Sequence, residues 1–198
     1  MNRHIGKGAG RLALFFSCLF MFYSHASKVS HSKFFTVSTD SIADEARLPE
    51  VFRILEKARR GLRGWGFVPP TLVRIVIHPT LADFRETGAQ WFELARANPG
   101  KNKIDTQRTS ILDTHGSLEI TLRHEFFHLV QPMDWPRWRS EGCAVLFSGA
   151  YIRATSFENT SEAELNRHLE HPNSQIQLNQ SMATAAIWAK KTGCRAQL

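Results

Sequence analysis

The chain has 198 residues, of which 42% are hydrophobic and 22% are charged, and its formal net charge is +7. This length and apolar content predict one domain with its own hydrophobic core and exclude two. Three of the 25 basic residues and none of the 18 acidic ones lie in residues 1–26, which leaves 22 minus 18, or +4, for the rest. That excess forms no basic stripe with interleaved aromatic residues, so we do not expect nucleic-acid binding.

Residues 1–26 have the pattern of a secretory signal peptide. Arg3, Lys7 and Arg11 give a positive start, a nearly unbroken apolar run extends from Leu12 to Tyr23, and Ser24-His25-Ala26 offers small residues for cleavage. We therefore predict a secreted, periplasmic or cell-envelope protein, without stable membrane insertion once the signal is removed. An uncleaved N-terminal anchor is the alternative, although the apolar run is short for a membrane span.

Residues 27–47 are rich in Ser, Thr and Lys and are interpreted as a lead-in segment. Within it, Phe34–Val37 is either an edge strand or part of the lead-in. Residues 48–198 are predicted to form the main domain. Its first elements, from apolar spacing and from Gly and Pro breaks, are a helix from 48 to about 62, a strand at 72–77, helices at 81–87 and 90–97, and a strand at 103–107.

The next segment carries the pattern on which the functional interpretation depends. It begins near Ser117, ends before Pro132, and contains His124-Glu125-Phe126-Phe127-His128, an HExxH motif. Two histidines four residues apart lie on one face of a helix, so both imidazoles can reach one metal ion. The intervening glutamate can reach a water on that ion without becoming a ligand. We expect one Zn²⁺ per chain at this helix.

The flanks of the motif predict a buried helix with one narrow polar stripe. Thr121, His124, His128 and Gln131 make the stripe. The apolar residues around it are Leu118, Ile120, Leu122, Phe126, Phe127, Leu129 and Val130. Buried ionisable groups need a partner or a cation, which favours a metal. The alternative is that the histidines only form hydrogen bonds with neighbouring backbone groups.

A second helix, at about 136–147, can supply the third ligand. Glu141 lies in its first turn and is followed by Gly142, whose missing side chain would let two helices approach closely. The alternative for Glu141 is a surface glutamate stabilised by the helix dipole. The strand at 103–107 precedes the HExxH helix, and we expect it either at the rim of the cleft, with a free edge for an extended substrate, or as a plain hairpin strand.

The motif His124–His128 followed by Trp138-Arg139-Ser140-Glu141-Gly142 resembles the signature of the peptidase MA-like gluzincins, in which HExxH is followed by W-x-x-E-G. The resemblance extends over roughly residues 48–195. It implies an α+β, zincin-like fold in which a small mixed sheet packs on the active-site helix and the C-terminal half is mainly helical.

For the site, the resemblance implies that His124, His128 and Glu141 bind zinc and that Glu125 is the general base. The implied activity is that of a secreted zinc metallopeptidase, which hydrolyses peptide bonds of a peptide or protein substrate. The alternative is an exported pseudo-peptidase, weak or inactive, that binds a partner. The presence of a carboxylate at Glu125 favours the enzyme.

The chain also departs from the family pattern. Val145 occupies the place, one turn after the glutamate ligand, where many gluzincins carry an acidic residue that orients a histidine. The family also supplies a downstream Tyr or His to stabilise the oxyanion, for which the candidates are Tyr151, His168 and His171. Cys143 and Cys194 could form a disulfide, a question that the sequence leaves open.

Overall fold

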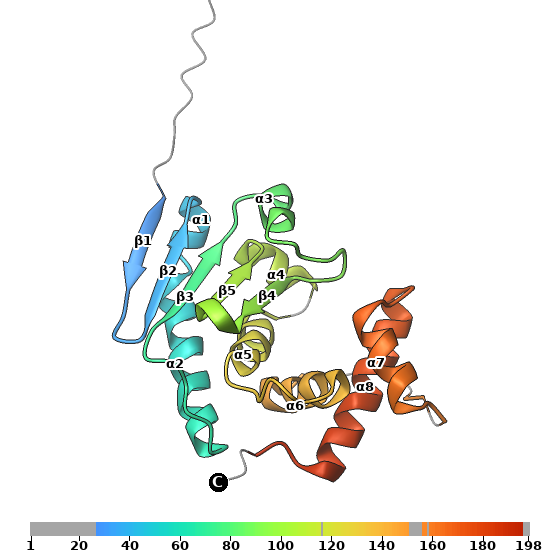
Figure 1. Cartoon of the computed structure of the whole chain (residues 1–198). Coiled ribbons are helices and arrows are strands. Elements are labelled where there is room, and N and C mark those ends of the chain that lie inside the picture. Colours follow the sequence, from blue (N-terminus) through green and yellow to red (C-terminus); the bar gives the residue numbers. More distant parts are fainter. Residues whose placement is uncertain (1–26, 116, 151–155, 158, 196–198) are drawn as a thin grey trace, which may run out of the picture.

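A computed structural model describes residues 27–115, 117–150, 156–157 and 159–195 (Figure 1). The predicted signal peptide, residues 1–26, lies outside them. The strands are β1 (Lys28–His31), β2 (Phe35–Thr39), β3 (Val73–Ile77), β4 (Ala95–Asn98) and β5 (Lys103–Thr106). The α-helices are α1 (Ile42–Glu45), α2 (Leu48–Gly64), α3 (Leu81–Glu86), α4 (Thr109–His115), α5 (Leu118–His128), α6 (Arg137–Ser148), α7 (Glu162–Glu170) and α8 (Gln175–Thr192). Of these helices, none is long and apolar enough to cross a bilayer.

The strands form one mixed sheet in the order β1-β2-β3-β5-β4. The three inner strands are parallel, and β1 and β4 pair antiparallel at the two edges. The chain after β5 contains only helices among the described residues, and Figure 1 shows α5 to α8 below and to the right of the sheet. The predicted α+β class, with a small mixed sheet and a mainly helical C-terminal half, is therefore confirmed.

One face of the sheet forms the main core. Alternate residues of the inner strands, such as Phe35, Ile75 and Ile104, are fully buried because successive side chains of a strand point to opposite faces. Phe35 meets Phe126 of α5 edge to face, with ring centroids 5.6 Å apart. The α5 helix is thus held by the core that also receives Leu55 of α2, and its position follows from apolar burial.

Several predicted elements are confirmed, and others are wrong. The helix from residue 48, the strands at 72–77 and 103–107 and the helix at 81–87 are present, with ends shifted by a few residues. The segment Phe34–Val37 contributes to β2, which is an inner strand and not an edge. The predicted helix at 90–97 is wrong, because residues 95–98 form β4 and pair with β5.

For the strand at 103–107, the free-edge alternative is wrong and the hairpin alternative is confirmed, because the strand forms an antiparallel hairpin with residues 95–98. It is β5, and both of its sides are paired, with β3 and with β4. The edge strand on this side of the sheet is β4, which the sequence predicted to be part of a helix. The run Ala95-Arg96-Ala97-Asn98 alternates over only four residues, and alanine and asparagine are poor strand formers, so the pairing with β5 overrides its local preference.

The C-terminal helices are joined covalently. A disulfide links Cys143 in the middle of α6 to Cys194 just after α8, across 51 residues of sequence. Both cysteines are buried, Cys143 completely. The question that the sequence left open is thereby answered, and the disulfide holds α8 against the helix that carries Glu141.

We expect the disulfide to contribute about 4 kcal/mol to stability, because closing a loop of this length lowers the entropy of the unfolded chain. The Cys143→Ala/Cys194→Ala variant should show this loss in urea unfolding, followed by far-UV circular dichroism. The unaltered protein should have the same free energy of unfolding as the variant only after its disulfide is reduced. An oxidised protein as unstable as the double variant would contradict the expectation.

Candidate metal centre

The HExxH helix is capped at its N-terminus and buried along one side. Ser117 is its N-cap, and its hydroxyl accepts a hydrogen bond from the Ile120 N–H. Leu122 and Phe126 are buried in the core, whereas His124 and His128 lie on the opposite side and line a cleft. The prediction of a buried helix with one polar stripe is therefore confirmed, since Thr121 and Gln131 line the same cleft.

The second helix brings Glu141 to the histidines. Trp138 is buried against Trp188 of α8, and its backbone N–H donates to the Asn166 side chain of α7, 2.8 Å away. This anchors the first turn of α6 and turns the buried Glu141 carboxylate toward α5. The surface interpretation of Glu141 is wrong, because its side chain is only 7% exposed.

The side chains of three residues converge as the sequence predicts. His124 Nε2 lies 3.1 Å from His128 Nε2 and 3.2 Å from Glu141 Oε2, and His128 Nε2 lies 3.5 Å from Glu141 Oε1. Ligands held 2.0–2.2 Å from a tetrahedral zinc ion are about 3.3–3.6 Å from one another. With Oε2 as the carboxylate ligand, the distances of 3.1 Å and 3.2 Å are close to this spacing, and one ligand atom from each of the three residues lies within 4.8 Å of the others. The donor set, two imidazole nitrogens and one carboxylate, fits a zinc ion.

Gln131 fixes the orientation of one imidazole. Its amide oxygen lies 2.8 Å from His128 Nδ1 and can only accept, so that nitrogen carries the proton and donates. His128 Nε2 then faces the other ligand atoms. Gln131, three residues after His128, therefore orients a histidine. Many gluzincins use for this an acidic residue at the position that Val145 occupies here. The place of Gln131 on the polar stripe was the sequence signal for this role.

Burial and charge act in opposite directions on the two most buried groups. Burial lowers the pKa of His128, but the charge of Glu141 and its hydrogen bond outweigh this and raise the pKa from 6.5 to about 9. Burial raises the pKa of Glu141, but the charges of Arg137 and His128 and the hydrogen bonds from both imidazoles hold it well below its usual range. Without a metal, the two residues form a buried ion pair at neutral pH.

The predicted general base is held by the edge of the sheet. The backbone N–H of Ala97 in β4 donates to Glu125 Oε2 at 2.8 Å. Glu125 also lines the cleft next to both histidines. No sequence signal could have identified this contact, because the segment containing Ala97 was predicted to be helical.

A cleft of about 650 Å³ lies over these residues. The segment before β4 and β4 itself form one wall, α5 and α6 form the base, and α7 and α8 form the other wall. Glu93 lies in the first wall. Its pKa is raised, mainly by burial and also by the nearby charge of Glu125, although a hydrogen bond from the Gln90 N–H lowers it. The cleft is therefore lined by groups of both charge signs.

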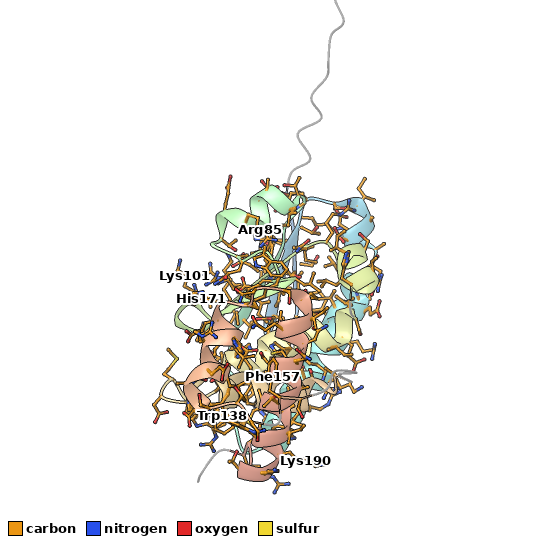
Figure 2. All side chains as sticks on the ribbon, turned by 90° about the vertical axis from the view of Figure 1, so that its right-hand side faces the viewer. Arg85, Lys101, Trp138, Phe157, His171 and Lys190 are labelled. Carbon is orange, nitrogen blue, oxygen red and sulfur yellow. A yellow bond between two sulfur atoms is a disulfide. The ribbon has the colours of Figure 1, made fainter. Side chains whose placement is uncertain are left out.

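The three oxyanion candidates have different positions. His171, at the turn between α7 and α8, lines the cleft, and Figure 2 shows it at a level between Arg85 and Trp138. His168 is buried beside Phe157 and is not among the residues that line the cleft. Tyr151 lies outside the described residues.

Gly142 allows a close helix contact, but with a different partner from the one expected. A Cβ atom added there would lie 2.2 Å from the Ala185 carbonyl oxygen and 2.8 Å from the Ala189 Cβ, both in α8. The glycine therefore lets α8 pack behind α6, and it does not bring α6 and α5 together. The effect on Glu141 is indirect, because α8 supports the helix that carries it.

The chain matches no family model, no curated protein and no solved structure in the comparisons with known proteins.

Zinc binding should release about one proton per ion at pH 7.5, because the metal must displace the proton that His128 carries below pH about 9. The apparent affinity for zinc should rise as the pH is raised to about 9. Calorimetric titration in two buffers with different ionisation enthalpies measures the released protons. A histidine with its ordinary pKa would release almost none at pH 7.5, and that result would contradict the expectation.

We expect Gly142→Ala to destabilise the protein by 3 kcal/mol or more, roughly the upper range of overpacking, because the added methyl group meets backbone atoms. Thermal unfolding measures the change. Gly64→Ala is the matched control: it is also helical, a Cβ there meets nothing within 4 Å, and it should be neutral or slightly stabilising. Equal melting temperatures for the two variants would contradict the close contact with α8.

Proposed function

We propose that the chain is an exported zinc metallopeptidase of the gluzincin type, with a zincin-like fold, and that it hydrolyses peptide bonds. The observation that carries the proposal is the convergence of His124, His128 and Glu141, at a spacing suited to one zinc ion, beneath a cleft that also contains Glu125. The buried disulfide supports export, because such bonds persist mainly in oxidising compartments.

When bound, zinc would act as a Lewis acid that lowers the pKa of a coordinated water and polarises the substrate carbonyl. The chain's own residues would perform the remaining steps. Glu125 would take the proton of the attacking water and later give it to the leaving amine. The Ala97 N–H would hold one oxygen of that carboxylate, which leaves the other oxygen to exchange the proton.

The backbone geometry at the edge of β4 favours a peptide as the substrate. The Gln107 N–H donates to the Leu94 carbonyl. Because hydrogen-bonded pairs alternate along an antiparallel ladder, Arg96 is the next residue whose backbone groups bond to β5. The backbone groups of Ala95 and Ala97 therefore point away from the sheet, and the Ala97 N–H does so toward Glu125. An extended peptide could pair with the remaining outward groups of this edge, beside the metal ligands.

A zinc-binding pseudo-peptidase remains the second candidate, and one observation favours it. Of the described oxyanion candidates, only His171 lines the cleft, and the structure gives it no contact with the proposed ligands. A chain without transition-state stabilisation would bind zinc and a peptide without efficient cleavage.

Glu125→Gln should lower the rate of casein cleavage by about 10²–10⁴-fold, because it removes the proton acceptor, and should leave zinc content unchanged. Peptide release with and without chelator gives the rate, and metal analysis gives the zinc content. Glu119→Gln is the control: it is in the same helix, but its carboxylate pairs with Lys57.

The outcomes separate the two candidates. Zinc at one equivalent without chelator-sensitive cleavage by the unaltered protein would favour the pseudo-peptidase. Cleavage at the same rate by Glu125→Gln would remove Glu125 from the mechanism.

A further inference from the structure

Among the described residues, Arg137 is a basic side chain in direct contact with a proposed ligand. It is the first residue of α6, one turn before Glu141, and its Nη2 lies 2.9 Å from Glu141 Oε1. Its own side chain is 41% exposed and lines the cleft. The guanidinium thus reaches from solvent to a carboxylate that is almost fully buried.

The two oxygens of Glu141 have different surroundings. Oε2 lies 3.2 Å from His124 Nε2, whereas Oε1 is shared between Arg137 at 2.9 Å and His128 Nε2 at 3.5 Å. A carboxylate that binds zinc through one oxygen leaves the other to a hydrogen-bond donor. Arg137 occupies Oε1 and limits rotation of the carboxylate, so Oε2 stays turned toward His124.

The neighbouring turn offers no alternative holder. Val145, one turn after Glu141, has no side-chain donor or acceptor, although it lines the same cleft. The contact to the Glu141 carboxylate therefore comes from the preceding turn. Arg139 is on the same helix but directs its guanidinium elsewhere, over the Trp135 ring and to the Gly193 carbonyl.

We propose that Arg137 is a positioning residue for the metal site, which holds Oε1 of Glu141 so that the carboxylate presents its other oxygen as a ligand. This inference rests on the proposed metal site. Two effects of the guanidinium oppose each other: it orients the ligand, and it repels a divalent cation. Orientation predicts that loss of Arg137 weakens zinc binding, whereas repulsion alone predicts that it strengthens binding.

The test measures zinc affinity by competition with a chromogenic chelator, for the full-length protein with its disulfide intact. Arg137→Gln should weaken binding by about 10–100-fold, the usual effect of removing a group that orients a metal ligand. Arg137→Lys should recover part of the loss, since it keeps one charged donor. Arg139→Gln should bind zinc as the unaltered protein does. Loss of a partner of the buried Glu141 carboxylate should also lower the melting temperature of metal-free Arg137→Gln, so affinities are compared at a temperature at which far-UV circular dichroism shows every variant to be folded.

Cobalt substitution gives a second readout, because the visible absorption of Co²⁺ depends on ligand geometry. The spectrum should change in Arg137→Gln and remain unchanged in Arg139→Gln. Unaltered or tighter zinc binding in Arg137→Gln, with an unchanged cobalt spectrum, would overturn the role of Arg137.

Glu141→Gln, in the same assay, separates failure of this inference from failure of the proposed function. If Glu141→Gln loses zinc and Arg137→Gln does not, only the role of Arg137 is overturned. If Glu141→Gln binds zinc as tightly as the unaltered protein, the metal site is wrong and the role of Arg137 falls with it.

Discussion

The burial of two imidazoles and a carboxylate between α5 and α6 is the constraint on which the rest of the structure depends. An ionised group moved from water into a protein interior costs several kcal/mol unless other groups compensate it. Here His128 and Glu141 compensate each other, and Arg137 and Gln131 complete their hydrogen bonds. The helices must therefore be held closely in register, since a small shift would leave a charge without its partner.

The surrounding elements provide that register from three directions. The core under the sheet holds α5 through residues such as Phe126, and α8 supports α6 through the close contact at Gly142. The link between Cys143 and Cys194 keeps α8 in place two residues beyond the glutamate. The site is thus formed by parts of the chain that are far apart in sequence, although its three proposed ligands lie within 18 residues of one another.

The sequence was sufficient for features that are encoded locally. Helical spacing predicted that His124 and His128 share a face, and the glutamate-glycine pair predicted an inward carboxylate at Glu141, both of which the geometry confirms. It was insufficient where tertiary pairing decides. The run containing Ala97 has weak local preference and becomes a strand only because β5 lies beside it. Likewise, Gly142 marked a close approach, but no local pattern could say that α8 was the partner.

The contact between Glu125 and the Ala97 N–H also affects whether another copy of the chain can add a strand to the sheet. An open edge strand is a template on which copies can add strands and aggregate. The β4 strand has only four residues, and one of its outward donors is already bonded to a charged side chain. A second copy would therefore find an interrupted ladder there, so this edge is protected against uncontrolled growth of the sheet.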